Sequence, residues 1–239
     1  MKRRAFTIQW ILLSLWAAIL VAAFAFGKLT PDRTRYAVRP LLMVTSALLV
    51  VMAVLFWWQY RLITSLTSFS LLLALGMAAS FIGDLIMAEY IPTPQRVIFG
   101  ILAFGAAHLL YITGYLNIAQ KLGLNIAWWA VGGGAIVLGI ILWAVFARSS
   151  QVSAALNYSG LAYTLLICVM TCLAIAVGLG APRLWPLPVG AILFLASDAI
   201  LANQIFRKRN WFLVSDVIWL LYISGQALIV WSNLAFKTR

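Results

Sequence analysis

Charged side chains are scarce in this sequence. Only 9% of its 239 residues are Asp, Glu, Lys or Arg, whereas 65% are hydrophobic and the mean hydropathy is +1.04. An average soluble domain carries about 25% charged residues. The composition therefore excludes an ordinary soluble domain and predicts a polytopic membrane protein.

Cysteine and histidine are scarcer still. The chain has two cysteines, Cys168 and Cys172, and one histidine, His108. The cysteines are four residues apart and so share one face of a helix, but a zinc site needs further thiolate or imidazole ligands. We interpret them as buried thiols that pack as small hydrophobic side chains, and we expect neither a metal nor a cofactor.

Apolar runs long enough to cross a bilayer occur eight times along the chain. A transmembrane helix needs about 20 mostly apolar residues, and the connections between these runs are short. The first run follows a basic N-terminus as in a signal peptide, but it is longer than a normal signal sequence and is interpreted as an uncleaved span. The sequence thus predicts one all-α transmembrane domain over residues 1–239, with spans at about 7–27, 40–59, 63–88, 97–117, 126–147, 158–179, 186–206 and 211–234.

Basic residues outnumber acidic ones, seventeen to five, for a net charge of +12. They are scattered among the ends of the predicted spans, which is typical of membrane anchors and argues against nucleic-acid binding. They divide almost evenly between the two sides, so the positive-inside rule does not fix the orientation. We expect a multi-pass protein of a bacterial inner membrane.

Two of the few acidic residues, Asp84 and Asp198, lie inside predicted spans. A carboxylate at the centre of a membrane helix costs roughly 2.5–3.5 kcal/mol on insertion scales, so such residues are usually functional. Each aspartate belongs to a near-copy of one segment, GDLIMA at 83–88 and SDAILA at 197–202. The pair therefore marks a candidate functional site.

A second pair of similar segments follows the first, LLYITG at 109–114 and LLYISG at 220–225. The offset is 111 residues, against 114 for the aspartates. Two pairs in the same order predict a tandem duplication of four spans, with pseudo-repeats 1–120 and 121–239. Such repeats share one orientation and are related by an axis along the membrane normal. We therefore expect the third and seventh spans to pack together, with Asp84 and Asp198 within roughly 10 Å of each other.

Several other polar residues are predicted at the same depth as the aspartates. At about 1.5 Å of rise per residue, they fall in the half of the membrane that lies opposite the termini. We expect a cavity there that opens toward the 28–39 loop and residues 207–209. These polar residues are His108, Tyr163, Asp216 and Tyr222.

Each of these residues also has a structural interpretation. Asp216 is close enough to the basic residues 207–209 to be an interfacial ion-pair partner, and we favour that over catalysis. A lone His108 is more often a hydrogen-bonding structural residue, although near two carboxylates it is a plausible proton partner. Asp84 and Asp198 could brace helices, but no Lys or Arg lies inside their spans. We expect one to be protonated and the other ionised, as general acid/base hydrolysis requires.

Longer motifs resemble one family, the lysoplasmalogenase-like or YhhN-like integral membrane proteins. The chain has Arg39-Pro40 where the family usually has Lys-Pro, a change that keeps the charge but not the geometry. The resemblance continues through nearly the whole chain. Its further elements are SFIGDLIM at 80–87, FGAAHLLY at 104–111, Tyr163 and Met170, GAILF at 190–194 before Ser197-Asp198, and Tyr222 with Gln226.

The resemblance implies hydrolysis of the vinyl ether bond of lysoplasmalogens to a fatty aldehyde and a glycerophospho-base. Asp84 and Asp198 match the family's acidic active-site positions. The implied partners are a lysophospholipid substrate and membrane lipids. Two other classes stay open, a proton-coupled transporter, which broken helices at matching positions would favour, and a lipid-binding protein without turnover. The expected substrate-binding residues are Arg39, His108, Tyr111, Tyr163, Tyr222 and Gln226.

Overall fold

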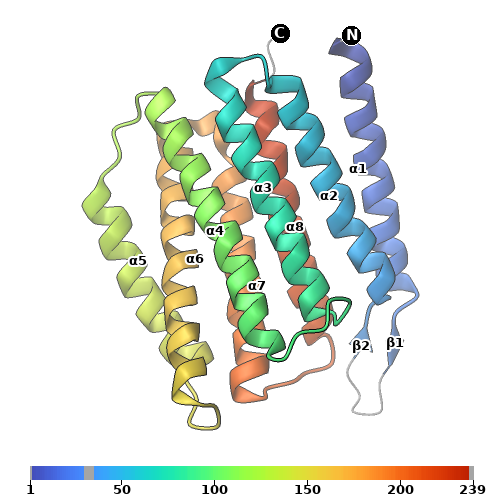
Figure 1. The fold of residues 1–239 in the computed structure, drawn as a ribbon, viewed down its shortest axis with the longest axis vertical. Coiled ribbons are helices and arrows are strands. Elements are labelled where there is room, and N and C mark those ends of the chain that lie inside the picture. Colours follow the sequence, from blue (N-terminus) through green and yellow to red (C-terminus); the bar gives the residue numbers. More distant parts are fainter. Residues whose placement is uncertain (1, 30–34, 237–239) are drawn as a thin grey trace.

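The computed structural model describes residues 2–29 and 35–236, and within them eight helices are long and apolar enough to cross a membrane. The predicted eight-span, helical membrane protein is confirmed (Figure 1). The long helices are α1 (Lys2–Ala25), α2 (Arg39–Tyr60), α3 (Thr64–Met87), α4 (Arg96–Lys121), α5 (Trp128–Leu142), α6 (Ala154–Gly180), α7 (Pro186–Arg207) and α8 (Val214–Trp231).

Short elements that the sequence analysis did not predict lie at the ends of these helices. Strands β1 (Lys28–Leu29) and β2 (Arg35–Tyr36) pair antiparallel between α1 and α2. A π-helical turn, η1 (Trp143–Ala147), extends α5. Two 3₁₀ turns, η2 (Pro182–Leu184) and η3 (Ser232–Phe236), precede α7 and follow α8.

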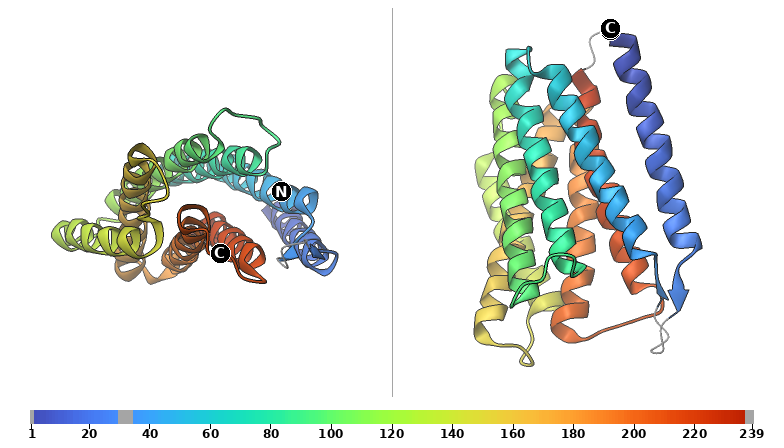
Figure 2. Two further views of the ribbon diagram at one scale, coloured as in Figure 1. Left: turned by 90° about the horizontal axis from the view of Figure 1, so that it is seen from below. Right: turned by 45° about the vertical axis from the view of Figure 1, so that its right-hand side comes forward.

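The helices form two layers with peripheral additions. Seen from below in Figure 2, α2, α3 and α4 make a curved row, and α7 and α8 lie on its inner side. Helix α3 packs chiefly on α2 and α4, and α7 on α6 and α8. The prediction that the third and seventh spans pack directly against each other is wrong, because neither is a main packing partner of the other within the described chain.

Glycines permit the closest helix contacts in the bundle. A Cβ added to Gly190 would lie 2.6 Å from the carbonyl oxygen of Gly225, and one added to Gly225 would lie 2.6 Å from that of Gly190. A Cβ added to Gly76 in α3 would collide with the ring of Tyr111 in α4, 2.6 Å from its Cδ1. Both antiparallel pairs, α3 with α4 and α7 with α8, therefore approach at distances that larger residues would prevent.

The two ends of the bundle differ in packing. Toward the chain termini, large side chains such as Phe56, Phe69 and Tyr115 are fully buried. The opposite end, where α3 and α7 finish and the strands lie (Figure 1), contains a cavity. The bundle is thus closely packed at the end that holds the termini and contains a cavity at the other end.

Candidate active site

A cavity of about 510 Å³ lies between the two layers, and both intramembrane aspartates line it. Its walls come from α2, α3, α4, α7 and α8, and its lining extends to Tyr36 and Arg39 at one edge and Lys208 at another. We call it the polar cavity. Its lining includes Tyr36, Arg39 and Lys208, so it lies at the end of the bundle where the cavity was predicted. The roughly 10 Å separation of the carboxylates stays a prediction.

Asp84 is fixed near the end of α3 by hydroxyl donors from two other helices. Its side chain is buried, and Oδ2 accepts hydrogen bonds from Ser46 Oγ of α2 at 2.5 Å and from Tyr222 Oη of α8 at 2.8 Å. Within the described residues, neither Asp84 nor Asp198 forms an ion pair. The hydroxyl groups therefore replace a counter-cation as the polar partners of Asp84.

Tyr222 is itself held by a chain of hydrogen bonds that leads away from the cavity. Tyr111 Oη donates to Gln226 Oε1 at 2.7 Å, and Gln226 Nε2 lies 3.5 Å from Tyr222 Oη. Tyr111 and Gln226 are both fully buried and line neither this cavity nor the smaller one described below. The structure thus places them behind Tyr222 and outside the lining of both cavities, and their contact with a substrate stays a prediction.

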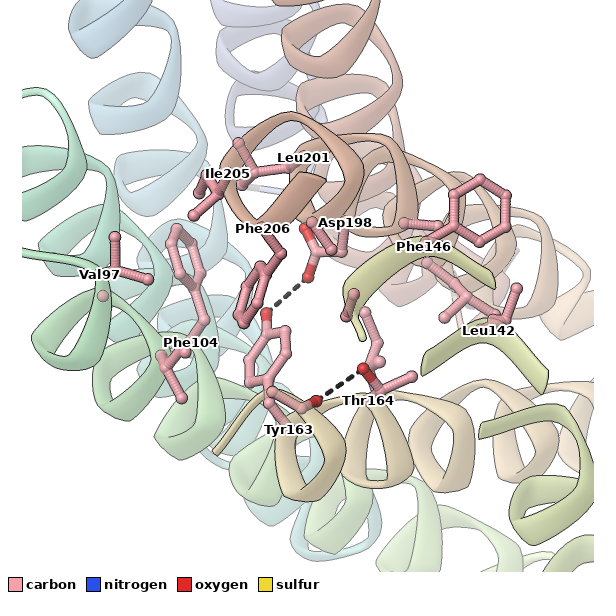
Figure 3. Close-up of a pocket in the computed structure, with 18 of the residues that line it drawn as sticks. Val97, Phe104, Leu142, Phe146, Tyr163, Thr164, Asp198, Leu201, Ile205 and Phe206 are labelled. Atoms are coloured by element: carbon pink, nitrogen blue, oxygen red, sulfur yellow. Dashed lines mark hydrogen bonds between the residues drawn. The ribbon is translucent and has the colours of Figure 1, made fainter. Parts of the chain in front are cut away.

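Asp198 lies on α7 and is only half-buried. Its Oδ2 accepts a hydrogen bond from Tyr163 Oη of α6 at 2.5 Å (Figure 3). Tyr163 Oη also lies 3.0 Å from His108 Nε2. His108 is fully buried, with its ring centroid 5.0 Å from that of Phe194. Contrary to the prediction, neither His108 nor Tyr163 lines the polar cavity, whereas Tyr222 does. Among the described residues, His108 is linked to Asp198 through Tyr163.

The arrangement of partners around His108 indicates its tautomer. Its Nδ1 is buried without a hydrogen-bond partner among the described residues. A buried N–H without an acceptor costs free energy, so the proton belongs on Nε2, which can donate to Tyr163. The Tyr163 hydroxyl then donates its own proton to Asp198, and the three groups form a directed chain.

A second, smaller cavity of about 70 Å³ is also lined by Asp198. Its lining is mostly apolar and comes from α3, α4, α5, η1, α6 and α7, with Tyr163, Thr164 and Asp198 as its polar members (Figure 3). We call it the apolar cavity. Small residues leave this space open, since Gly160, Ala199 and Ala202 all line it.

Asp216 has a different partner from the one predicted. It forms an ion pair with Arg35, and its Oδ1 accepts a hydrogen bond from the backbone of Ala37 at 3.1 Å. Arg207 instead donates to the Val145 carbonyl oxygen in η1. The predicted pairing with residues 207–209 is therefore wrong, whereas the structural interpretation of Asp216 is supported, because it ties β2 to the start of α8.

Cations surround the opening of the polar cavity. Arg39, Arg96 and Lys208 are all exposed and all line it. Arg96 pairs with Glu89, and Arg39 lies 5.9 Å from the ring centroid of Tyr36. The cavity therefore has a basic opening and an acidic interior, an arrangement that suits a ligand with an anionic group at one end.

Sequence reasoning found both aspartates but missed Ser46. Nothing marks this residue in the sequence, because a serine in an apolar helix usually bonds its own backbone or packs against a neighbouring helix. Cys168 and Cys172 are free thiols, the first buried and the second half-buried. The described residues contain no cluster of three or more His, Cys, Asp or Glu side chains suited to a metal.

The fold and the cavity define a multi-pass membrane protein with two carboxylates in a membrane-embedded cavity. The chain belongs to the YhhN family, which it matches over residues 34–233, from β2 through α8. This family includes lysoplasmalogenases, and the resemblance noted in the sequence motifs is confirmed. Comparisons with curated proteins and with solved structures give no match.

Proposed function

We propose that the protein is a membrane-embedded hydrolase that cleaves the vinyl ether bond of lysoplasmalogens to a fatty aldehyde and a glycerophospho-base. Asp84 and Asp198 act as its general acid and base. The observation that carries the proposal is that both carboxylates line one cavity, and that neither has a cationic partner in the described chain. Membership in the YhhN family supports the substrate class.

The chemistry of a vinyl ether suits two carboxyl groups. Cleavage starts with proton transfer to an alkene carbon, which generates an oxocarbenium ion, and water then captures this ion to form a hemiacetal. The catalyst needs one protonated acid and one ionised base near the reacting bond. Two carboxylates in one low-dielectric cavity without a counter-cation favour a state with one proton between them.

The size and charge of the polar cavity suit a lysophospholipid. Its volume of about 510 Å³ falls within the roughly 300–1,000 Å³ of small-molecule sites. The headgroup phosphate lies at the opening near Arg39, Arg96 and Lys208, and the glycerol backbone points toward the aspartates. A single-chain lipid can enter sideways from the leaflet, because the site lies inside the membrane-spanning bundle.

The two halves of the chain derive from one duplicated four-helix unit. The close-contact glycines support this proposal, since Gly76 and Gly190 are separated by 114 residues, as the aspartates are. Each aspartate also accepts a hydrogen bond from a hydroxyl group on the preceding long helix, from Ser46 for Asp84 and from Tyr163 for Asp198. The halves differ beyond this point, because Tyr222 bonds Asp84 whereas its counterpart Tyr111 bonds Gln226.

A proton-coupled transporter is the second candidate, but the helices carrying the aspartates do not favour it. Transporters of this kind usually bind substrate at interrupted helices with unwound backbone. Helix α3 runs from Thr64 to Met87 and α7 from Pro186 to Arg207 without a break at either aspartate. Rigid carrier helices suit a fixed catalytic geometry better than a moving gate.

The decisive experiment is aldehyde release by the purified protein in detergent micelles. The substrate is 1-alkenyl-glycerophosphocholine, and the control is its saturated 1-alkyl ether, which has no alkene to protonate. We expect aldehyde from the first substrate only. Asp84→Asn and Asp198→Asn should each abolish it, because an amide keeps the shape of the side chain but cannot exchange the catalytic proton.

The control is Arg148→Gln, which removes an exposed charge that lines neither cavity. It should leave the rate unchanged. Near wild-type turnover by either aspartate variant would contradict the two-carboxylate mechanism. No aldehyde from the wild-type protein would contradict the hydrolase proposal itself.

A further inference from the structure

The two cavities meet at Asp198, whereas Asp84 borders only one of them. Asp198 lines both the polar and the apolar cavity, and Phe104 and Leu201 do the same. Asp84 lines the polar cavity alone. The aspartates are therefore not equivalent, since one stands at the boundary between an apolar and a polar compartment and the other stands within the polar compartment.

The reaction itself is directional along the substrate. In a vinyl ether, the proton must reach the alkene carbon on the hydrocarbon side, and water must add to the next carbon, which bears the ether oxygen. The acid is thus needed one bond closer to the chain than the base. If a site holds the alkenyl chain on one side and the headgroup on the other, the carboxyl group nearer the chain is the acid and the one nearer the headgroup is the base.

We propose that the apolar cavity binds the first carbons of the substrate's alkenyl chain, so that Asp198 is the acid that protonates carbon and Asp84 is the base that activates water. The inference rests on the hydrolase function proposed above. The occupant is a hydrocarbon because the lining offers it apolar groups such as Phe104, Leu142 and Phe206. The cationic opening of the polar cavity holds the opposite, anionic end of the same molecule.

Local structure supports a separate subsite at this position. The π turn η1 brings Phe146 and Ala147 to the apolar cavity, next to Leu142 at the end of α5, and Arg207 stabilises this turn through the Val145 carbonyl oxygen. Such π-helical turns are rare and frequently occur at functional sites. Phe206 closes the cavity beside Gly160, where an added Cβ would lie 3.1 Å from the phenyl ring.

The proton balance of the proposed cycle closes. Asp198 gives its proton to the chain-side carbon, the π electrons form the new C–H bond, and an oxygen lone pair completes the oxocarbenium ion. Water adds to the carbon bearing oxygen, and Asp84 takes the proton that the water loses. When the hemiacetal collapses, Asp84 protonates the departing glycerol oxygen and Asp198 accepts the hydroxyl proton, which restores both groups with one water consumed.

Rescue by azide tests the assignment of roles. Azide can trap an oxocarbenium ion without a base, so it should accelerate substrate loss by Asp84→Ala by about tenfold or more. The product is an ether with azide on the carbon next to oxygen, detected by mass spectrometry. Asp198→Ala should not respond, because its missing step is protonation of carbon. Acceleration of Asp198→Ala, or of neither variant, would overturn the assignment.

A filled cavity tests the chain subsite independently. Ala202→Phe narrows the apolar cavity, and Ala106→Phe places the same ring on an exposed position of α4 as the matched control. The readout is the kcat/KM ratio of the hexadecenyl substrate over the vinyl substrate, which lacks the chain. Since each buried methylene contributes several-fold in affinity, we expect Ala202→Phe to lower this ratio by about tenfold or more. Ala106→Phe should keep the wild-type ratio.

The outcomes separate the two proposals. If the wild-type protein cleaves both substrates and Ala202→Phe retains the wild-type ratio, the subsite is wrong and the hydrolase function stands. If the wild-type protein cleaves neither substrate, the function itself fails.

Discussion

Tyr222 and Ser46 donate to the same oxygen of Asp84, so this carboxyl group depends on the hydroxyl groups around it. A hydrogen bond to a charged group contributes about 1.5–3 kcal/mol. We expect Tyr222→Phe to lower kcat by roughly tenfold or more, with a smaller change in KM, because the ring still fills the cavity wall. Steady-state kinetics on the alkenyl lysolipid measures both constants.

Tyr111→Phe is the comparison for this variant. Its hydroxyl is three hydrogen bonds away from Asp84, through Gln226 and Tyr222, so its loss should lower kcat less than the loss of the Tyr222 hydroxyl does. Equal kcat values for the two variants would contradict the view that Tyr222 acts directly on Asp84.

At the scale of single residues, the sequence indicates which side chains have a function but not which side chains they contact. Asp84 and Asp198 were predictable because a carboxylate is costly in a membrane. Ser46 was not predictable, because a serine in a membrane helix has a small free-energy cost and is common there. Arg35 was not found as the partner of Asp216, because that contact depends on how β2 lies across the start of α8.

Between elements, the close approach of α7 and α8 depends on two glycines. A methyl group at Gly190 would lie 2.6 Å from the Gly225 carbonyl oxygen and 3.1 Å from the Ile229 nitrogen, both rigid backbone atoms. We expect Gly190→Ala to destabilise the protein by about 1–3 kcal/mol, as overpacking does. The unfolding midpoint can be read from the reactivity of the buried Cys168 with a thiol-reactive dye during heating.

Gly133→Ala is the control, since a Cβ at that position of α5 meets no atom within 4 Å. Alanine is the better helix former, so this variant should unfold at the wild-type temperature or slightly above it. A midpoint for Gly190→Ala equal to that of Gly133→Ala would contradict the importance of the close contact.

The helices were predictable as elements, because eight apolar runs of spanning length leave little choice of structure. Their packing was less predictable. The repeat predicted contact between α3 and α7, but each of these helices packs mainly against its own hairpin partner, α3 against α4 and α7 against α8. The π turn η1 also escaped prediction, because its sequence, WAVFA, is indistinguishable by hydropathy from an α-helical turn.

On the scale of the whole molecule, the bundle separates positive charge at the opening of the polar cavity from two carboxyl groups inside it. An exposed ion pair is worth about 0.2–1 kcal/mol, so loss of the charge at Arg39 or Lys208 should raise KM for a phosphate-bearing substrate by roughly two- to fivefold. Suitable variants are Arg39→Gln and Lys208→Asn, the second because Lys208 has a φ of 57° and asparagine tolerates that conformation. Arg148→Gln removes an exposed cation outside both cavities and should leave KM unchanged.

The substrate provides the second control for the charge at the opening. 1-Alkenyl-glycerol carries the same vinyl ether and chain but no phosphate, so neither Arg39→Gln nor Lys208→Asn should change its KM. The wild-type preference for the phosphorylated substrate should also weaken as salt is added, because exposed charges are screened over about 10 Å at 0.1 M ionic strength. A KM that rises equally for both substrates would mean that these side chains shape the opening without recognising phosphate. The basic opening would then reflect anchoring at the membrane surface, and the headgroup would lie elsewhere in the polar cavity.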